Sequence, residues 1–192
     1  MVAAPEGWSA STRRGLLSNV GALAALGLGP AALAGCGHRR PRLHEPLGAS
    51  AADVALLNAA LALEQRAIAA YTAAAPLLSG DAQHAAGRFL GQQLTHAGEL
   101  RRLIKELGGH AHEPLSHYHF GHPRGRAQLL ALLHGLEQQQ IAAYLHALPL
   151  IAVPEVRQSL GAILANHAQH VTVLRAEQGL SPLTGPFVTA AE

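Results

Sequence analysis

The sequence predicts an all-α protein built as a four-helix bundle. Apolar residues recur every three or four positions along four segments, which is the spacing of one face of a helix. Hydrophobic residues make up 49% of the chain and aromatic residues only 4%, and the residues that favour strands are sparse. The third and fourth segments also repeat the first and second, so a helical hairpin occurs twice.

The first 35 residues resemble an export signal. Arg13-Arg14 stand directly before an apolar stretch, residues 15–34, as in a twin-arginine signal peptide. That stretch is only mildly hydrophobic, whereas a membrane-spanning helix needs about 20 strongly apolar residues. It ends in Leu33-Ala34-Gly35-Cys36, which resembles the lipobox where bacterial lipoproteins are acylated. We expect export, cleavage before Cys36, and a lipid anchor on the outer face of the cytoplasmic membrane or on the periplasmic side.

Four parts of the chain follow from these signals. They are the signal peptide (1–35), the lipidated Cys36 with a polar linker (36–49), the bundle (50–179) and a C-terminal tail (180–192) that we expect to fold back. Cys36 is the only cysteine, so lipidation leaves none for a disulfide. The net charge is only +2, so we expect no nucleic acid among the partners. The membrane, through lipid on Cys36, and a second copy packed through helices are the candidate partners, and a protein partner stays unidentified.

The first two helices form a hairpin. Ser50-Ala51-Ala52-Asp53 has the form of a capping box, after which an apolar stripe runs from Val54 to Leu78. The second stripe runs from Ala86 to Leu107 and stops at Gly108-Gly109. Because only a few residues separate the two helices, we expect them to be antiparallel.

The second hairpin repeats the first. The third helix begins near Pro123 with a stripe to Ile151, and the fourth runs from Pro154 to Gly179. Residues 64–71 (EQRAIAAY) match residues 137–144 (EQQQIAAY) at an offset of 73 (137 − 64), and Pro76 matches Pro149. His96 matches His167 at an offset of 71 (167 − 96).

A long connection separates the hairpins. Residues 109–123 number 15 (123 − 109 + 1). Fifteen extended residues can cover roughly 50 Å, and helices of about 26 residues span roughly 40 Å. The connection can therefore run the whole length of the bundle and make the second and third helices parallel.

Ionisable side chains interrupt the apolar stripes at one level. Glu64 and Glu137 occupy core positions on the first and third helices, and His96 and His167 lie at the same height on the other two. A buried carboxylate costs several kcal/mol unless a cation, a proton or hydrogen bonds compensate for its lost hydration. The pattern therefore predicts a Glu/His site at the centre of the bundle.

From about Ser50 to Gly179 the chain resembles the ferritin-like superfamily, specifically the bacterial exported ferritin-like proteins. The resemblance implies one long crossover between two helical hairpins, a Glu from the first and third helices, and Glu-x-x-His from the second and fourth. In that family these residues bind two iron or manganese ions for oxidation or oxygen chemistry. Glu64 and Glu137 match the single glutamates, and Gln93-Leu94-Thr95-His96 matches Glu-x-x-His with Gln in place of Glu.

The fourth helix allows two alignments with the family pattern. The repeat makes His167 the family histidine and puts Leu164 where the carboxylate belongs. A shift of one turn gives His167-Ala168-Gln169-His170, with His in place of Glu. Two of the four carboxylates are absent in either alignment, which argues against a dinuclear centre.

Two interpretations of the central layer stay open. One is a single divalent ion (iron, manganese or zinc) held by Glu64, His96, Glu137 and His167, with Gln93 and His170 in reach. The other is a metal-free layer in which each Glu bonds a His or a Tyr. Tyr71 and Tyr144, seven residues after each Glu, are core aromatics, hydrogen-bond donors or redox partners, and His134 could orient Glu137.

The connection between the hairpins is rich in histidine. Five histidines fall within thirteen residues (122 − 110 + 1): His110, His112, His117, His119 and His122. They predict either a second metal site for zinc, copper or nickel, or a solvated loop.

The leading functional hypothesis is an exported, lipid-anchored ferritin-like protein with a Glu/His metal site that could be redox-active. A metal-free helical envelope or interaction module, and a metal carrier that uses the connection, are the alternatives. No enzyme activity follows from the sequence, because it contains no phosphate loop, nucleotide fingerprint or nucleophile–base–acid set.

Overall fold

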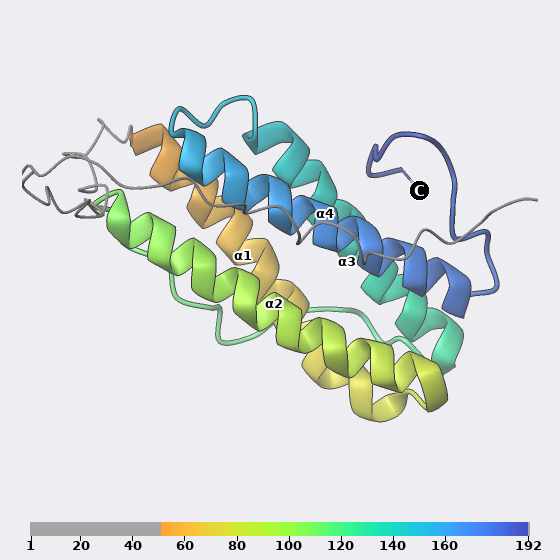
Figure 1. Ribbon diagram of the computed structural model, residues 1–192. Coiled ribbons are helices and arrows are strands. Elements are labelled where there is room, and N and C mark those ends of the chain that lie inside the picture. Colours follow the sequence, from red (N-terminus) through yellow and green to blue (C-terminus); the bar gives the residue numbers. More distant parts are fainter. Residues whose placement is uncertain (1–50, 192) are drawn as a thin grey trace, which may run out of the picture. The chain divides into compact units, whose positions relative to one another are not determined.

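Four long helices make up most of residues 51–191, the part of the chain that the computed structural model describes (Figure 1). They are α1 (Ala51–Ala74), α2 (Gly80–Glu106), α3 (Gly125–Ala147) and α4 (Pro154–Glu177), with a short 3-10 turn, η1 (Ala75–Leu77), after α1. There is no strand in this range, which confirms the all-α expectation. No helix among these residues is both long and apolar enough to cross a membrane. The arginine pair, the lipobox with Cys36, and Ser50 lie outside the described residues.

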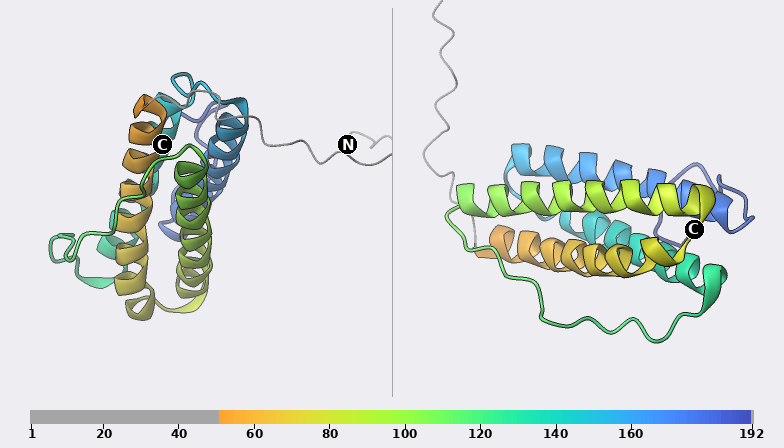
Figure 2. Two further views of the ribbon diagram at one scale, coloured as in Figure 1. Left: turned by 90° about the vertical axis from the view of Figure 1, so that its left-hand side faces the viewer. Right: turned by 90° about the horizontal axis from the view of Figure 1, so that it is seen from below.

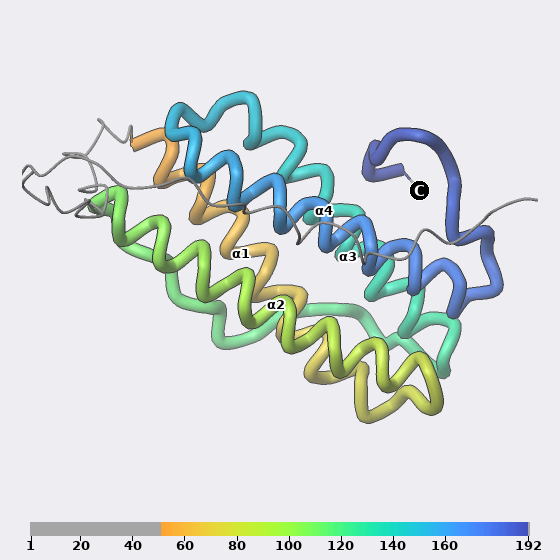
Figure 3. The backbone as a smooth tube through the Cα atoms, in the orientation of Figure 1, coloured from red at the N-terminus to blue at the C-terminus, as the bar shows by residue number. Residues whose placement is uncertain are grey.

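The connectivity is also the expected one. Figure 2 shows α1 and α2 as one antiparallel hairpin and α3 and α4 as another. The crossover, residues 107–124, runs along the outside of α1 and α3, so that α2 and α3 point the same way (Figure 3). Side chains of α1 hold it there: Asn58 bonds the carbonyl of His110 at 3.0 Å and the amide of His112 at 2.8 Å, and Gln65 bonds the carbonyl of His112 at 2.8 Å.

Two helices end earlier than their apolar stripes predict. We expected stripes to Leu78 and Ile151, but α1 ends at Ala74 and α3 at Ala147. Each end lies two residues before a proline, Pro76 or Pro149, which has no N–H to bond the preceding turn. The helix ends keep the offset of the repeat, 73 residues (147 − 74). Similarly, α3 begins at Gly125, two residues after the proline at which we expected it.

The core consists of two apolar clusters at opposite ends of the bundle. One contains Leu57, Leu61, Leu100, Ile104, Ile151 and Leu160, and the other contains Ala70, Phe89, Leu130, Leu133 and Leu174. Because Glu64 on α1 follows Leu61 and precedes Ala67, it lies at the junction of the two clusters. The tail, residues 180–191, folds back over α3 and α4, where Pro182 and Phe187 line a small cavity together with Ile141 and Val171.

Candidate metal centre

Six polar side chains meet in the layer between the two apolar clusters. Their residues are Glu64, Gln93, Glu137, His167 and His170, each 0% exposed, and His96, which is 8% exposed. All six are residues that the sequence singled out, and they come from all four helices. Because water is almost excluded here, each charge depends on its neighbours in the protein.

Glu137 is surrounded by hydrogen-bond donors. Its Oε1 atom accepts bonds from the Tyr71 hydroxyl at 2.5 Å and the Gln93 amide at 2.9 Å, and it lies 3.1 Å from Nδ1 of His170. Its Oε2 atom lies 2.7 Å from Nδ1 of His167. Both oxygens of this carboxylate are therefore satisfied by the protein itself.

Gln140 and Gln92 complete this side of the layer. Gln140 and Gln93 exchange amide bonds of 2.9 and 3.3 Å, which fixes the end of Gln93 that faces Glu137. Nε2 of His170 lies 2.6 Å from Oε1 of Gln92. The expectations from the sequence missed both glutamines, although Gln140 follows Glu137 by one turn on the buried face of α3.

Glu64 has fewer partners. Its Oε1 atom accepts a bond from the Tyr144 hydroxyl at 2.6 Å and lies 3.0 Å from Nε2 of His167. Its Oε2 atom has no hydrogen-bond partner among the described residues, and neither has Nδ1 of His96, although both atoms are buried. These two atoms lie 3.6 Å apart.

His167 links the two carboxylates. Its Nδ1 faces Glu137 and its Nε2 faces Glu64, so both ring nitrogens must carry a proton to donate to both. Burial alone would lower the pKa of this histidine, but the two carboxylates outweigh burial and raise it to about 9. In the metal-free protein the ring is therefore an imidazolium held between two anions.

The same contacts keep both glutamates ionised. Burial raises their pKa values, but bonds and charge from His167 and His170 lower the pKa of Glu137 to about 2. Glu64 likewise has a lowered pKa, since His167 and His96 outweigh the effect of burial. Burial, followed by the neighbouring carboxylates, raises the pKa of Tyr71 and Tyr144 well above 10, so both remain hydrogen-bond donors.

The tyrosines exchange partners between the two hairpins. Tyr71 on α1 bonds Glu137 on α3, while Tyr144 on α3 bonds Glu64 on α1. From the sequence, core packing and hydrogen-bond donation were both open as roles for these tyrosines. The structure shows both roles, because each tyrosine is fully buried and each donates to a carboxylate. The exchange has the form expected for two copies of one hairpin related by a two-fold axis.

Two groups of three side chains have the geometry to hold a metal ion. They are Glu64 with His96 and His167, and Glu137 with His167 and His170; in each, one ligand atom per residue lies within 4.8 Å of the others. In the second group every ligand atom already has a partner. The first group contains Oε2 of Glu64 and Nδ1 of His96, which have no partner among the described residues. It is therefore the group that can take an ion without breaking a bond to Glu137.

The remaining sequence candidates lie apart from this layer. His134 is half-buried on α3, one turn before Glu137, and its role in orienting that residue stays a prediction. The crossover histidines His110, His112, His117, His119 and His122 are exposed. Within residues 51–191 no three of them converge as metal ligands. The second metal site stays a prediction.

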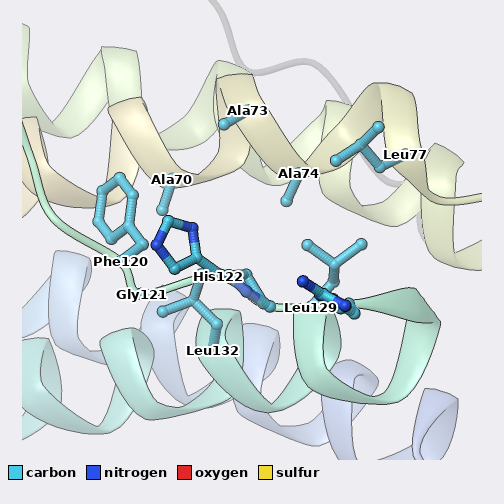
Figure 4. A pocket seen from close by; sticks show the side chains of 11 residues that line it. Ala70, Ala73, Ala74, Leu77, Phe120, Gly121, His122, Leu129 and Leu132 are labelled. Atoms are coloured by element: carbon cyan, nitrogen blue, oxygen red, sulfur yellow. The ribbon is translucent and has the colours of Figure 1, made fainter.

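One crossover histidine lines a surface cavity of about 410 Å³. Figure 4 shows Phe120 and His122 of the crossover between Ala70 on α1 and Leu132 on α3. This cavity contains none of the central ligands, since it is formed where the crossover crosses the end of the bundle.

Comparisons with known proteins agree with this fold. Residues 52–180 match the family described as the ferritin-like domain. No curated protein matches the chain. Among solved structures, a conserved hypothetical protein of Mycobacterium tuberculosis is 20% identical with a TM-score of 0.63, and the match covers 71% of this chain and 96% of that one.

Two further solved structures have the same fold. A ferritin-like, diiron-carboxylate protein of Bacillus anthracis is 23% identical with a TM-score of 0.59, and the match covers 66% of this chain and 95% of that one. A dodecameric thioferritin of Bacteroides fragilis, related to bacterioferritin, is 20% identical with a TM-score of 0.60, with coverages of 67% and 84%. At these identities the likeness concerns the fold alone.

Proposed function

The chain belongs to the ferritin-like domain family, and from this premise we propose that it binds one divalent metal ion in the bundle core through Glu64, His96 and His167. The observation that carries the proposal is a pair of buried atoms, Oε2 of Glu64 and Nδ1 of His96, which lie 3.6 Å apart and have no hydrogen-bond partner in the described part of the chain. A buried polar atom without a partner costs about 1–3 kcal/mol. A bound cation would satisfy both atoms at once.

The ligand set suits a small range of ions. Two imidazoles and one carboxylate are typical ligands of zinc, iron and manganese. When bound, such an ion supplies a Lewis acid, and iron or manganese also supplies a one-electron redox centre. Cation binding at Nε2 of His167 requires that atom to release its proton, while Nδ1 keeps the bond to Glu137. Protons and metal ions therefore compete for His167.

Glu137 has the role of a fixed support in this proposal. Its four partners, Tyr71, Gln93, His167 and His170, hold it in place, and it in turn orients the His167 ring. One ion per chain follows, in contrast to the two irons of a diiron-carboxylate protein such as the Bacillus anthracis neighbour.

The metal-free module is the second candidate function. It is favoured by one observation, the imidazolium of His167, which already neutralises part of the charge of both carboxylates. The central layer would then serve only to fix the alignment of the four helices.

Metal analysis separates these two functions. Untagged protein is equilibrated with manganese, iron(II) or zinc, desalted and analysed for bound metal. We expect one ion per chain, and none in Glu64→Gln or His96→Ala. The matched control is His84→Ala, an exposed histidine on the same helix as His96, which should bind as the unaltered protein does. If the unaltered protein retains no metal, the metal-free module is the correct function.

We further propose that the protein is exported and anchored by lipid on Cys36. The arginine pair before an apolar stretch, followed by Leu33-Ala34-Gly35-Cys36, supports this. Mass spectrometry of the membrane-bound form should find an acylated N-terminal cysteine at position 36. Cys36→Ser should release the protein from the membrane fraction, whereas retention of this variant would contradict the proposal.

A further inference from the structure

A line of polar side chains runs between α2 and α4. It consists of Gln92, His96 and Glu99 on α2 and Ser159, Asn166 and His170 on α4, a group that we call the α2–α4 seam. The α2 members are spaced four and three residues apart, so they share one face of that helix. Two hydrogen-bonding contacts cross the seam, from Ser159 to Glu99 at 2.9 Å and between His170 and Gln92 at 2.6 Å.

These two contacts fix the register of the antiparallel helices. Ser159 lies opposite Glu99, and His170 lies opposite Gln92. Asn166 lies between Ser159 and His170 and, being seven residues after Ser159, on the same face of α4. His96 has the corresponding place between Gln92 and Glu99. Asn166 therefore faces the part of α2 that carries His96.

The amide of Asn166 has an unpartnered oxygen. Its Nδ2 atom donates to Oε1 of the exposed Gln169 at 3.1 Å, which directs the nitrogen outward. Its Oδ1 atom is buried and has no hydrogen-bond partner among residues 51–191. Together with Nδ1 of His96 and Oε2 of Glu64, this gives three unpartnered buried atoms from the seam to the centre.

The seam is also where the central layer comes closest to solvent. The His96 side chain is 10% exposed, whereas those of Glu64 and His167 are fully buried. Moreover, α2 and α4 pack against each other less extensively than the other neighbouring pairs of helices. An ion that reaches Glu64 past His96 would meet this side of the bundle first.

We propose that the α2–α4 seam is the entrance through which a divalent cation reaches Glu64, His96 and His167, and that Asn166 is a positioning residue at this entrance. This inference rests on the proposed metal site. The neutral Oδ1 atom replaces one water of the incoming ion while that ion is transferred to His96, because amide oxygens suit hard and borderline cations. Asn166 is not a ligand of the final site, so it sets the rate of binding and leaves the affinity unchanged.

Cobalt(II) is a suitable probe, since its visible absorption reports directly on coordination. Stopped-flow mixing of the full, untagged chain with cobalt(II) gives the association rate, and a titration gives Kd. For Asn166→Leu we expect association about ten-fold slower, dissociation slowed to match, and Kd within about three-fold of the unaltered value. Asn166→Asp, which keeps an oxygen in place, should associate at least as fast as the unaltered protein. Gln158→Leu, an exposed glutamine on the same helix with no bond to Asn166, is the matched control and should leave the rates unchanged.

Three results would overturn the inference. An unchanged association rate in Asn166→Leu, with the helical circular dichroism intact, would show that ions enter elsewhere. A Kd raised more than about ten-fold at an unchanged association rate would make Asn166 a ligand and not an entrance residue. Failure of the unaltered protein to bind cobalt(II), manganese and zinc would overturn the metal site itself, and the inference with it.

Discussion

The two core glutamates occupy equivalent positions in the repeat, yet their surroundings differ. Glu137 has partners for both carboxylate oxygens, from Tyr71, Gln93, His167 and His170. Within residues 51–191, Glu64 has partners for one oxygen only, and its other oxygen faces an equally unpartnered nitrogen of His96. Glu137 is therefore fully hydrogen-bonded by the protein, whereas Glu64 has one oxygen free to coordinate an ion.

The repeat explains how the difference arose. Gln93 on α2 corresponds to Leu164 on α4 (93 + 71), and Gln140 on α3 corresponds to Ala67 on α1 (140 − 73). Glu137 is thus surrounded by amides where Glu64 has apolar neighbours. The position equivalent to His170 is Glu99 (170 − 71), which bonds Arg102 and Ser159 instead of the centre. Divergence of these three pairs is sufficient to make the two sides unequal.

The largest effect should come from removing the charge of Glu137. Glu137→Gln leaves buried donors of His167, His170 and Gln93 without a charged acceptor, so we expect a loss of about 3–5 kcal/mol in the free energy of unfolding. Glu64→Gln should cost less, about 2 kcal/mol, because fewer donors depend on it. Urea titration followed by circular dichroism measures both. Equal losses would mean that the two sides are energetically alike.

Next comes the dependence of stability on pH in metal-free protein. The pKa of His167 is raised from 6.5 to about 9, so its stabilisation is complete below pH 6.5 and is lost as pH rises towards 9, by about 3 kcal/mol. The pKa of Glu137 is lowered from 4.5 to about 2, so its contribution is complete above pH 4.5 and lost as pH falls towards 2. Stability should therefore be greatest between about pH 4.5 and 6.5. His167→Gln should abolish the decline on the alkaline side, and a decline that persists in this variant would contradict the assignment.

Gln93→Glu should create a second metal site beside Glu137. The new carboxylate would lie beside Glu137, where the amide nitrogen of Gln93 now lies 2.9 Å from Oε1. Repulsion should cost the metal-free protein about 2 kcal/mol, and the number of bound ions should rise from one to two per chain. Gln93→Leu is the control, because it removes the same hydrogen bond without adding a ligand. Elemental analysis that finds one ion in both variants would mean that Gln93 does not limit the stoichiometry.

The smallest effects should come from the tyrosines. Tyr144→Phe removes one of the few bonds to Glu64, and we expect a loss of about 2 kcal/mol. Tyr71→Phe should cost about 1 kcal/mol, because Glu137 keeps its other donors. Thermal unfolding of the two variants, measured side by side at pH 6, tests this order. The reverse order would show that the other donors to Glu137 do not compensate for the lost Tyr71 bond.

Much of this molecule could be predicted from its sequence. The spacing of apolar residues indicated the helices, the repeat indicated the hairpins, and the length of the crossover indicated their connection. The interruption of apolar stripes by Glu64, Glu137, His96 and His167 identified the central layer, because charged residues are rarely placed there without a reason.

The contacts within the layer could not be predicted in the same way. Periodicity assigns a side chain to a face but not to a rotamer, and a shift of one turn on the fourth helix exchanges His167 with His170. Which of the two bridges the carboxylates depends on distances of a few ångströms between all four helices. Gln140 is different: it lies seven residues after Leu133 on the core face of α3, so its position alone could have identified it.

The exchange of tyrosines makes the two hairpins depend on each other. Each hairpin supplies the hydroxyl that the other hairpin's glutamate requires, and Arg66 bonds Gln139, its own equivalent in the repeat (66 + 73). Such reciprocal pairing is the rule in symmetric dimers. With these contacts a single hairpin leaves its own glutamate without a tyrosine donor, so one such hairpin alone would need a second copy of itself, and the crossover makes that pairing covalent.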